Sequence, residues 1–258
     1  MSIKNLEDKR ILLTRAEECL PALDKLVQAR GALPFHLPCL GVEAIYETLL
    51  EAMSSLQAYS DVVFTSTNGV NVLKSAMDSQ GFCIKKMLSG KRIAAVGQAT
   101  ADALRRHGVH VDIIPYISSQ DGLLAAYGVH GVPRSLLFFR AEEGRDTLSS
   151  VLESKGVHVT MVFTYRTICP QTDAAEVIQS IQQNEMDAVL LGSPKTARYY
   201  IRRVGSLVLA DQPVVAVISE SMAVTVRSLG LSVQVVAKRA SFEAMLDALD
   251  EYFENHPA

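Results

Sequence analysis

Short apolar runs recur along this chain, and segments with apolar residues at helical spacing follow them. RILLTR (residues 10–15) precedes a periodic stretch at 17–30, DVVFTST (61–67) precedes one at 69–77, and RIAAVG (92–97) precedes one at 98–106. Unbroken apolar strands of this kind are typical of parallel sheets with helices on both faces, joined by right-handed crossovers. The pattern therefore predicts an α/β fold.

Glycines mark the expected ends of several helices. Gly31, Gly108, Gly156 and Gly230 each follow a helical pattern and precede an apolar run. A glycine just after a helix is typical of a left-handed cap, which ends the helix without a steric penalty.

The chain also resembles itself. R-A-E-E occurs at 15–18 and again at 140–143, and Gly31 matches Gly156 at the same spacing behind it. DVVFTST (61–67) resembles DAVLLGSP (187–194), and residues 92–114 resemble 214–236 in the same order. The repeat predicts two similar parallel-sheet lobes with a cleft between them, where ligands commonly bind. The alternative is that any two α/β segments share this much similarity.

Length and composition fit this picture. The 258 residues suffice for two α/β units, and 48% of them are hydrophobic against 21% charged. No apolar stretch reaches the roughly 18 residues that span a bilayer, so we expect a cytoplasmic protein without a membrane partner. The net charge of −3 argues against an extended nucleic-acid surface, and the four cysteines have no metal-site or disulfide spacing.

Four loops at expected strand ends carry small hydroxyl residues or glycine directly before a helix. In open parallel sheets ligands sit at these ends, and the free N–H groups of a helix start attract anions. The loops therefore suit a ligand with several carboxylates, although the same residues also serve as ordinary helix caps. The loops span residues 65–69, 97–100, 192–196 and 219–221.

The sequence lacks the motifs of several common enzyme chemistries. The chain lacks a dinucleotide or P-loop glycine motif and a nucleophile elbow, so we expect no cofactor. Gly108 separates His107 from His110 and breaks their helical spacing, while the other histidines have no partners at ligand spacing. We therefore expect no metal site.

Positive side chains near the strand ends could meet an anion. We expect Arg15 and Arg140 each to be the first residue after an apolar strand, from which their guanidinium groups would reach a ligand. Arg198 and Arg239 are interpreted as surface charge, and Arg166, Lys195 and Lys238 remain candidates.

These motifs together resemble one family. F-T-S-x-N-G-V at 64–70, A-V-G-x-x-T-A at 95–101, G-S-P at 192–194 and A-V-I-S at 216–219 resemble the motifs of uroporphyrinogen-III synthases, in the same order over nearly the whole chain. The resemblance implies a first lobe built from residues 1–37 and 167–258 and a second from 41–164, joined by two extended crossings near 37–41 and 165–171. Periodicity alone would divide the chain near residue 131.

The resemblance also implies a reaction and a site. Such enzymes close the linear, polycarboxylated hydroxymethylbilane with loss of water and inversion of its fourth pyrrole, act as monomers and need no cofactor. Tyr165 matches the family's cleft tyrosine, and we expect it to assist loss of the hydroxyl. The expected substrate-binding residues are Arg15, Thr65, Ser66, Asn68, Thr100, Arg140, Ser193, Pro194, Lys195, Ser219 and Ser221.

The chain departs from the family pattern at two positions, with Met222 in place of the usual threonine and Thr67 in place of proline. Two other interpretations stay open. A two-lobed binding protein for a small acidic metabolite would need the same loops and no chemistry. A two-lobed sugar transferase usually has a longer chain and a glutamate-rich nucleotide-sugar site.

Overall fold

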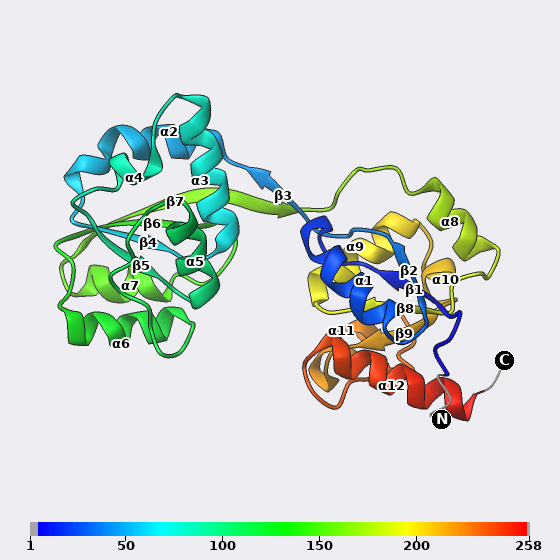
Figure 1. Ribbon diagram of the computed structural model, residues 1–258. Helices are drawn as coiled ribbons and strands as arrows, with labels where there is room; N and C mark the ends of the chain where they lie inside the picture. The colour runs from blue at the N-terminus through cyan, green and yellow to red at the C-terminus, as the bar shows by residue number, and fades with distance from the viewer. Residues whose placement is uncertain (1–4, 257–258) are drawn as a thin grey trace. The chain divides into compact units, whose positions relative to one another are not determined.

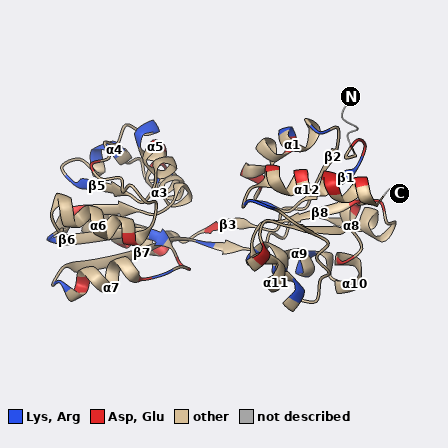
Figure 2. Ribbon diagram, turned by 90° about the horizontal axis from the view of Figure 1, so that it is seen from below, with Lys and Arg blue, Asp and Glu red and all other residues tan. Residues whose placement is uncertain are grey.

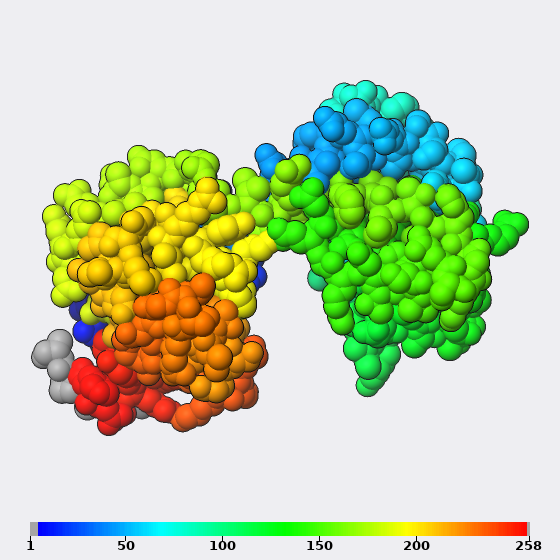
Figure 3. All heavy atoms as spheres, turned by 180° about the vertical axis from the view of Figure 1, so that it is seen from behind, coloured from blue at the N-terminus to red at the C-terminus, as the bar shows by residue number. Residues whose placement is uncertain are grey.

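The computed structural model describes residues 5–256, and these form two compact units (Figure 1). The first, here the terminal unit, contains the chain up to Gly41 and again from Ile168 onward. The second, here the central unit, is Val42–Thr167. The blue N-terminal atoms and the red C-terminal helix belong to the same unit (Figure 3), so the chain crosses between the units twice.

The terminal unit is built on a five-stranded sheet in the order β10-β9-β8-β1-β2. Its strands are β1 (Arg10–Leu13), β2 (Leu33–His36), β8 (Ala188–Leu191), β9 (Val214–Val217) and β10 (Val235–Val236), and all its pairs are parallel. Alternate residues of these strands enter two separate cores, because successive side chains of a strand point to opposite faces.

Helices cover both faces of this sheet. After the short helix η1 (Glu17–Cys19), α1 (Leu20–Gln28) packs with α12 (Phe242–Asn255) on the face of Ile11 and Leu13. The face of Leu12 and Val189 is covered by α8 (Ala175–Gln182), α9 (Pro194–Val204), α10 (Leu207–Ala210) and α11 (Glu220–Ser228).

The central unit repeats this plan. Its sheet has the order β3-β7-β6-β4-β5, from β3 (Gly41–Ala44), β4 (Asp61–Phe64), β5 (Arg92–Ala95), β6 (Ser135–Ala141) and β7 (His158–Ile168). One face carries α2 (Tyr46–Ser55), η2 (Leu56–Ala58), α3 (Thr67–Ser79), α4 (Ile84–Met87) and α5 (Gln98–Arg106). The other carries α6 (Gln120–His130) and α7 (Thr147–Ser154).

The internal repeat predicted from the sequence is present as matching topology. β8, β9, β1 and β2 of the terminal unit occupy the sheet positions of β4, β5, β6 and β7 in the central unit. In the edge strand β10, Val235 pairs with Ala216 of β9. The isolated bridge between Ile113 and Ala94 of β5 is the counterpart of this pair in the central unit. The prediction of two similar parallel-sheet α/β units is therefore confirmed.

Local expectations hold at the helix ends. Gly31, Gly108, Gly156 and Gly230 have φ values of 81°, 74°, 82° and 92°, as left-handed caps require. Two placements were wrong, because Arg140 lies inside β6 and Arg15 is the second residue after β1, not the first. Tyr165 likewise lies inside β7, paired with Ala141 of β6.

Charged residues lie mainly on the helices and loops around the two sheets (Figure 2). Within residues 5–256, no helix combines the length and apolar character needed to cross a bilayer.

Candidate functional site at the strand ends

Serine caps begin most of the helices that follow the strand ends. Ser66 Oγ accepts from the N–H of Gly69 (3.1 Å) at the start of α3, and Ser193 Oγ accepts from Thr196 (3.2 Å) at the start of α9. Ser219 Oγ accepts from Met222 (3.3 Å) at the start of α11, whereas Gly97 before α5 has no capping side chain. Each cap satisfies one N–H of a helix start and leaves others available.

Tyr165 lies in β7 of the central unit and contacts the start of α3. Only 9% of it is exposed, and its Oη–H donates to Ser66 Oγ at 3.0 Å. The bond joins β7 to the first turn of α3, although the two residues are far apart in sequence. Because the N-terminus of a helix carries a partial positive charge, negative charge at either oxygen is stabilised there.

Gly69 lets these groups come together. A Cβ at this position would lie 3.2 Å from Thr164 Oγ1 and 3.3 Å from Ser66 Oγ, tighter than ordinary contact. The Thr164 hydroxyl is itself buried and donates to the carbonyl of Arg140 at 3.0 Å. The glycine of the predicted 65–69 loop therefore has a packing role beside the tyrosine.

The side chain of Arg140 turns inward. It is 3% exposed, and its guanidinium donates to Asp146, to the Arg145 carbonyl (3.0 Å) and to the Ala141 carbonyl (3.0 Å). These bonds shape the loop that follows β6. The guanidinium also lies over the rings of Phe138 and Phe163, 5.8 Å from each. Its assignment as a substrate-binding residue stays a prediction.

Arg15 has the equivalent position in the terminal unit but a freer environment. It is half-buried, its guanidinium lies over the ring of Phe242 (5.7 Å), and Nη2 contacts Cys19 Sγ at 3.8 Å. None of these partners is an anion. The Arg15 guanidinium therefore keeps more of its donor capacity than that of Arg140.

The structure brings Thr65, Ser66, Asn68 and Tyr165 together at one edge. Thr65 lies over the end of β6, with its N–H 3.3 Å from the Phe139 carbonyl, and Asn68 is half-buried in the first turn of α3. Thr100, in the first turn of α5, is 5% exposed.

The remaining predicted residues belong to the terminal unit. Ser193, Pro194 and Lys195 begin α9, and Ser219 and Ser221 begin α11. Pro194 and Ser221 are exposed, while Ser193, Lys195 and Ser219 are half-buried.

Met222 occupies the position where the family usually carries threonine. It is 4% exposed and packs into the core beneath α11. Thr100, at the corresponding position of the central unit, is buried as well. The methionine therefore serves as core, and a ligand at this helix start would meet N–H groups and the Ser219 hydroxyl.

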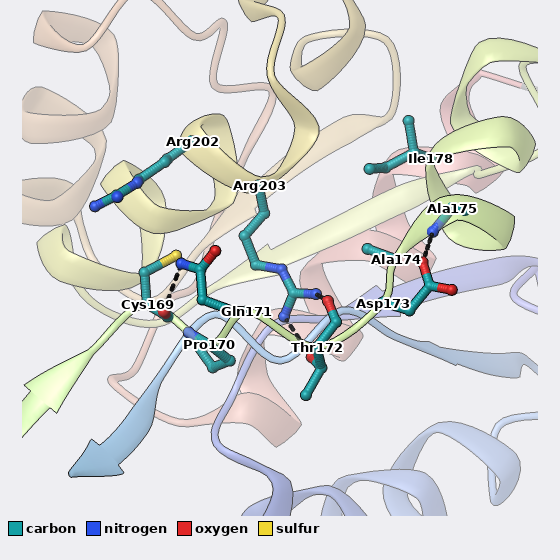
Figure 4. A pocket seen from close by; sticks show the side chains of 10 residues that line it. All are labelled: Cys169, Pro170, Gln171, Thr172, Asp173, Ala174, Ala175, Ile178, Arg202 and Arg203. Carbon is teal, nitrogen blue, oxygen red and sulfur yellow. Dashed lines mark hydrogen bonds between the residues drawn. The ribbon is translucent and has the colours of Figure 1, made fainter.

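Sequence reasoning missed two features. It named Ser66 and Tyr165 separately and did not foresee their hydrogen bond. It also missed a hollow of about 460 Å³ in the terminal unit (Figure 4). There Arg203 donates to the Pro38 carbonyl and to Thr172, while the side chain of Arg202 points away from Thr172. The hollow contains none of the predicted site residues.

Metal-binding side chains do not gather at these edges. Across residues 5–256, His, Cys, Asp and Glu form no group of three or more that could hold a metal ion.

Known proteins resemble the chain over most of its length. The family model for uroporphyrinogen-III synthase HemD matches residues 21–247. A uroporphyrinogen-III synthase of Synechococcus elongatus is 26% identical, covering 98% of each chain. A porphyrin biosynthesis protein HemD of Ruminiclostridium josui is 27% identical over 96% of this chain, which spans only 49% of that longer relative.

Two solved structures share the fold. Uroporphyrinogen-III synthetase from Helicobacter pylori matches with a TM-score of 0.65 and 17% identity, covering 95% of this chain and 99% of the other. A mutant uroporphyrinogen III synthase from Thermus thermophilus matches with a TM-score of 0.57 and 17% identity, covering 96% and 99%. The family model over residues 21–247 confirms the family predicted from the motifs, with its lyase activity in tetrapyrrole biosynthesis. The chain belongs to the uroporphyrinogen-III synthase family.

Proposed function

We propose that this chain closes hydroxymethylbilane into uroporphyrinogen III, with loss of water and inversion of the fourth pyrrole ring. One observation of the structure carries the proposal beyond family membership. A largely buried tyrosine, Tyr165, is hydrogen-bonded at 3.0 Å to Ser66 at the start of α3, where a proton donor and anion-binding N–H groups coincide.

The helix starts bind the carboxylates of the substrate. In the central unit these are the starts of α3 and α5, and in the terminal unit those of α9 and α11. An anion at a helix N-terminus gains about 0.3–1 kcal/mol, so several such contacts are needed to hold a flexible tetrapyrrole. Each carboxylate that is held removes conformational freedom, and a chain held with its ends in place reacts faster without further chemistry.

Tyr165 assists departure of the terminal hydroxyl as a proton donor. Replacing it with phenylalanine keeps the ring and removes the phenol, so Tyr165→Phe lowers turnover by roughly ten- to a thousandfold. Tyr59→Phe is a matched control, because Tyr59 is 8% exposed and donates to Thr160 Oγ1 at 2.7 Å in the same unit. The measurement is initial rates with freshly generated hydroxymethylbilane. Wild-type turnover in Tyr165→Phe removes the proposed role.

The monomeric state and the cytoplasmic location stay predictions. The alternative function, a binding protein without catalysis, uses the same helix starts for an acidic metabolite. It predicts no acceleration of ring closure, and the same initial rates would show this.

A further inference from the structure

The hydrogen bonds around Ser66 determine which proton can reach a ligand. A serine hydroxyl has one donor and two acceptor positions. Ser66 Oγ accepts from the Gly69 N–H at 3.1 Å and from the Tyr165 Oη–H at 3.0 Å, so both acceptor positions are filled. Within residues 5–256 its own O–H has no hydrogen-bond acceptor, and the side chain is half-buried, so this proton is free to donate to a ligand.

Tyr165 is in the opposite situation. It is 9% exposed, and its proton points at Ser66. A tyrosine held in this way delivers its proton to the serine, and the half-buried serine hydroxyl is the more accessible of the two groups. The proton nearest to a bound substrate is therefore that of Ser66.

The terminal unit supplies a comparison. Ser193 caps α9 in the corresponding place, but its second hydroxyl contact is Thr196 Oγ1 (2.7 Å), a residue of the same helix. Capping alone therefore does not require a tyrosine behind the serine. Among the described residues, only the central unit has a tyrosine hydrogen-bonded to the capping serine at this helix start.

We propose that Ser66 is a catalytic residue that protonates the leaving hydroxyl, and that Tyr165 acts through it. This inference rests on the proposed function. When the terminal C–O bond of the substrate breaks, its electron pair stays on the oxygen, which takes the proton of Ser66 Oγ and leaves as water. Ser66 takes the proton of Tyr165, and the phenolate that remains faces the positive start of α3.

The relay is restored within the same turnover. Ring closure first joins the carbon that lost the hydroxyl to the substituted α-carbon of the fourth pyrrole, which forms a spiro intermediate. The bond from that α-carbon to its former methylene bridge then breaks, the methylene carbon bonds to the free α-carbon of the same pyrrole, and that carbon loses its proton. That proton returns through Ser66 to Tyr165, so no external acid or base is consumed.

The test is a double-mutant cycle of Ser66→Ala and Tyr165→Phe, with kcat and KM measured on hydroxymethylbilane. In a relay each single change lowers kcat by a similar factor, roughly ten- to a thousandfold, and leaves KM nearly unchanged. The double variant is then no slower than the slower single variant, because either change already interrupts the proton path. Ser66→Thr retains the hydroxyl and restores most of the rate.

A control separates catalysis from the loss of a helix cap. Ser119 caps α6 in the same unit, accepting from the Gly122 N–H at 3.0 Å, so Ser119→Ala loses a cap of the same kind and keeps the wild-type kcat. Two results overturn the proposal: wild-type kcat in Ser66→Ala, or losses that multiply in the double variant. If the wild-type protein forms only the unrearranged isomer, it is the proposed function that fails, whatever the variants do.

Discussion

Two glycines of helix α6 give a quantitative test of the central unit. A Cβ on Gly122 would lie 2.0 Å from the carbonyl oxygen of Ile117 and 3.1 Å from its carbon, whereas nothing lies within 4 Å of a Cβ on Gly128. Ordinary contact needs roughly 3.5 Å, so Gly122→Ala must push the Ile117 carbonyl aside by more than about 1 Å. That carbonyl accepts from the Ser119 N–H at 2.7 Å, and Ser119 in turn caps the helix.

The two substitutions should therefore change the free energy of unfolding in opposite directions. Overpacking costs about 1–3 kcal/mol and a lost cap about 1 kcal/mol, against about 1 kcal/mol gained from replacing glycine in a helix. We expect Gly122→Ala to lower the free energy of unfolding by about 1–3 kcal/mol. Gly128 is exposed in the same helix, so Gly128→Ala should raise it by about 0.5–1 kcal/mol.

Guanidinium-induced unfolding, followed by circular dichroism, measures both variants against the wild type. Each kcal/mol corresponds to a melting shift of roughly 2–4 °C in a chain of this size. The close approach of the 117–119 loop to α6 is refuted if Gly122→Ala is as stable as Gly128→Ala.

Three further outcomes follow from the structure. The hydroxyl of Tyr127 is buried without a hydrogen-bond partner among the described residues, so Tyr127→Phe should raise the free energy of unfolding by about 1 kcal/mol, and a loss in denaturant titration would contradict this. A hydrogen bond from the N–H of Lys86 lowers the pKa of the exposed Cys83 thiol, whereas burial raises the pKa of Cys39. Iodoacetamide at neutral pH should therefore label Cys83 first, and peptide mapping would show this. Added salt should raise KM for the substrate, since partly exposed ion contacts are screened beyond about 8 Å at physiological strength, and a constant KM would count against the carboxylate contacts.

Local pattern was enough to predict much of the fold. The apolar runs located β1, β4 and β5, the glycines located helix ends, and the repeat predicted two units of equal topology. These features depend on residues close in sequence, or on similarity between segments, and both can be seen in a single chain. The hydroxyl residues before the helices were likewise recognisable, because capping is a local preference.

Contacts between distant segments could not be predicted in this way. Arg140 looked like a residue after a strand, yet β6 continues through it and Asp146 binds its guanidinium. The bond between Tyr165 and Ser66 depends on the order β7-β6-β4 in the sheet and on β7 extending to Ile168. Neither the strand order nor the strand length is encoded in the spacing of apolar residues.

The central claim is that the chain directs ring closure toward the inverted isomer. The most direct measurement is the isomer composition of porphyrins formed from fresh hydroxymethylbilane, oxidised and separated by chromatography, at increasing protein concentration. We predict that the type III isomer rises with protein until it replaces type I, the product of closure without enzyme. A type I product at every protein concentration would contradict the account.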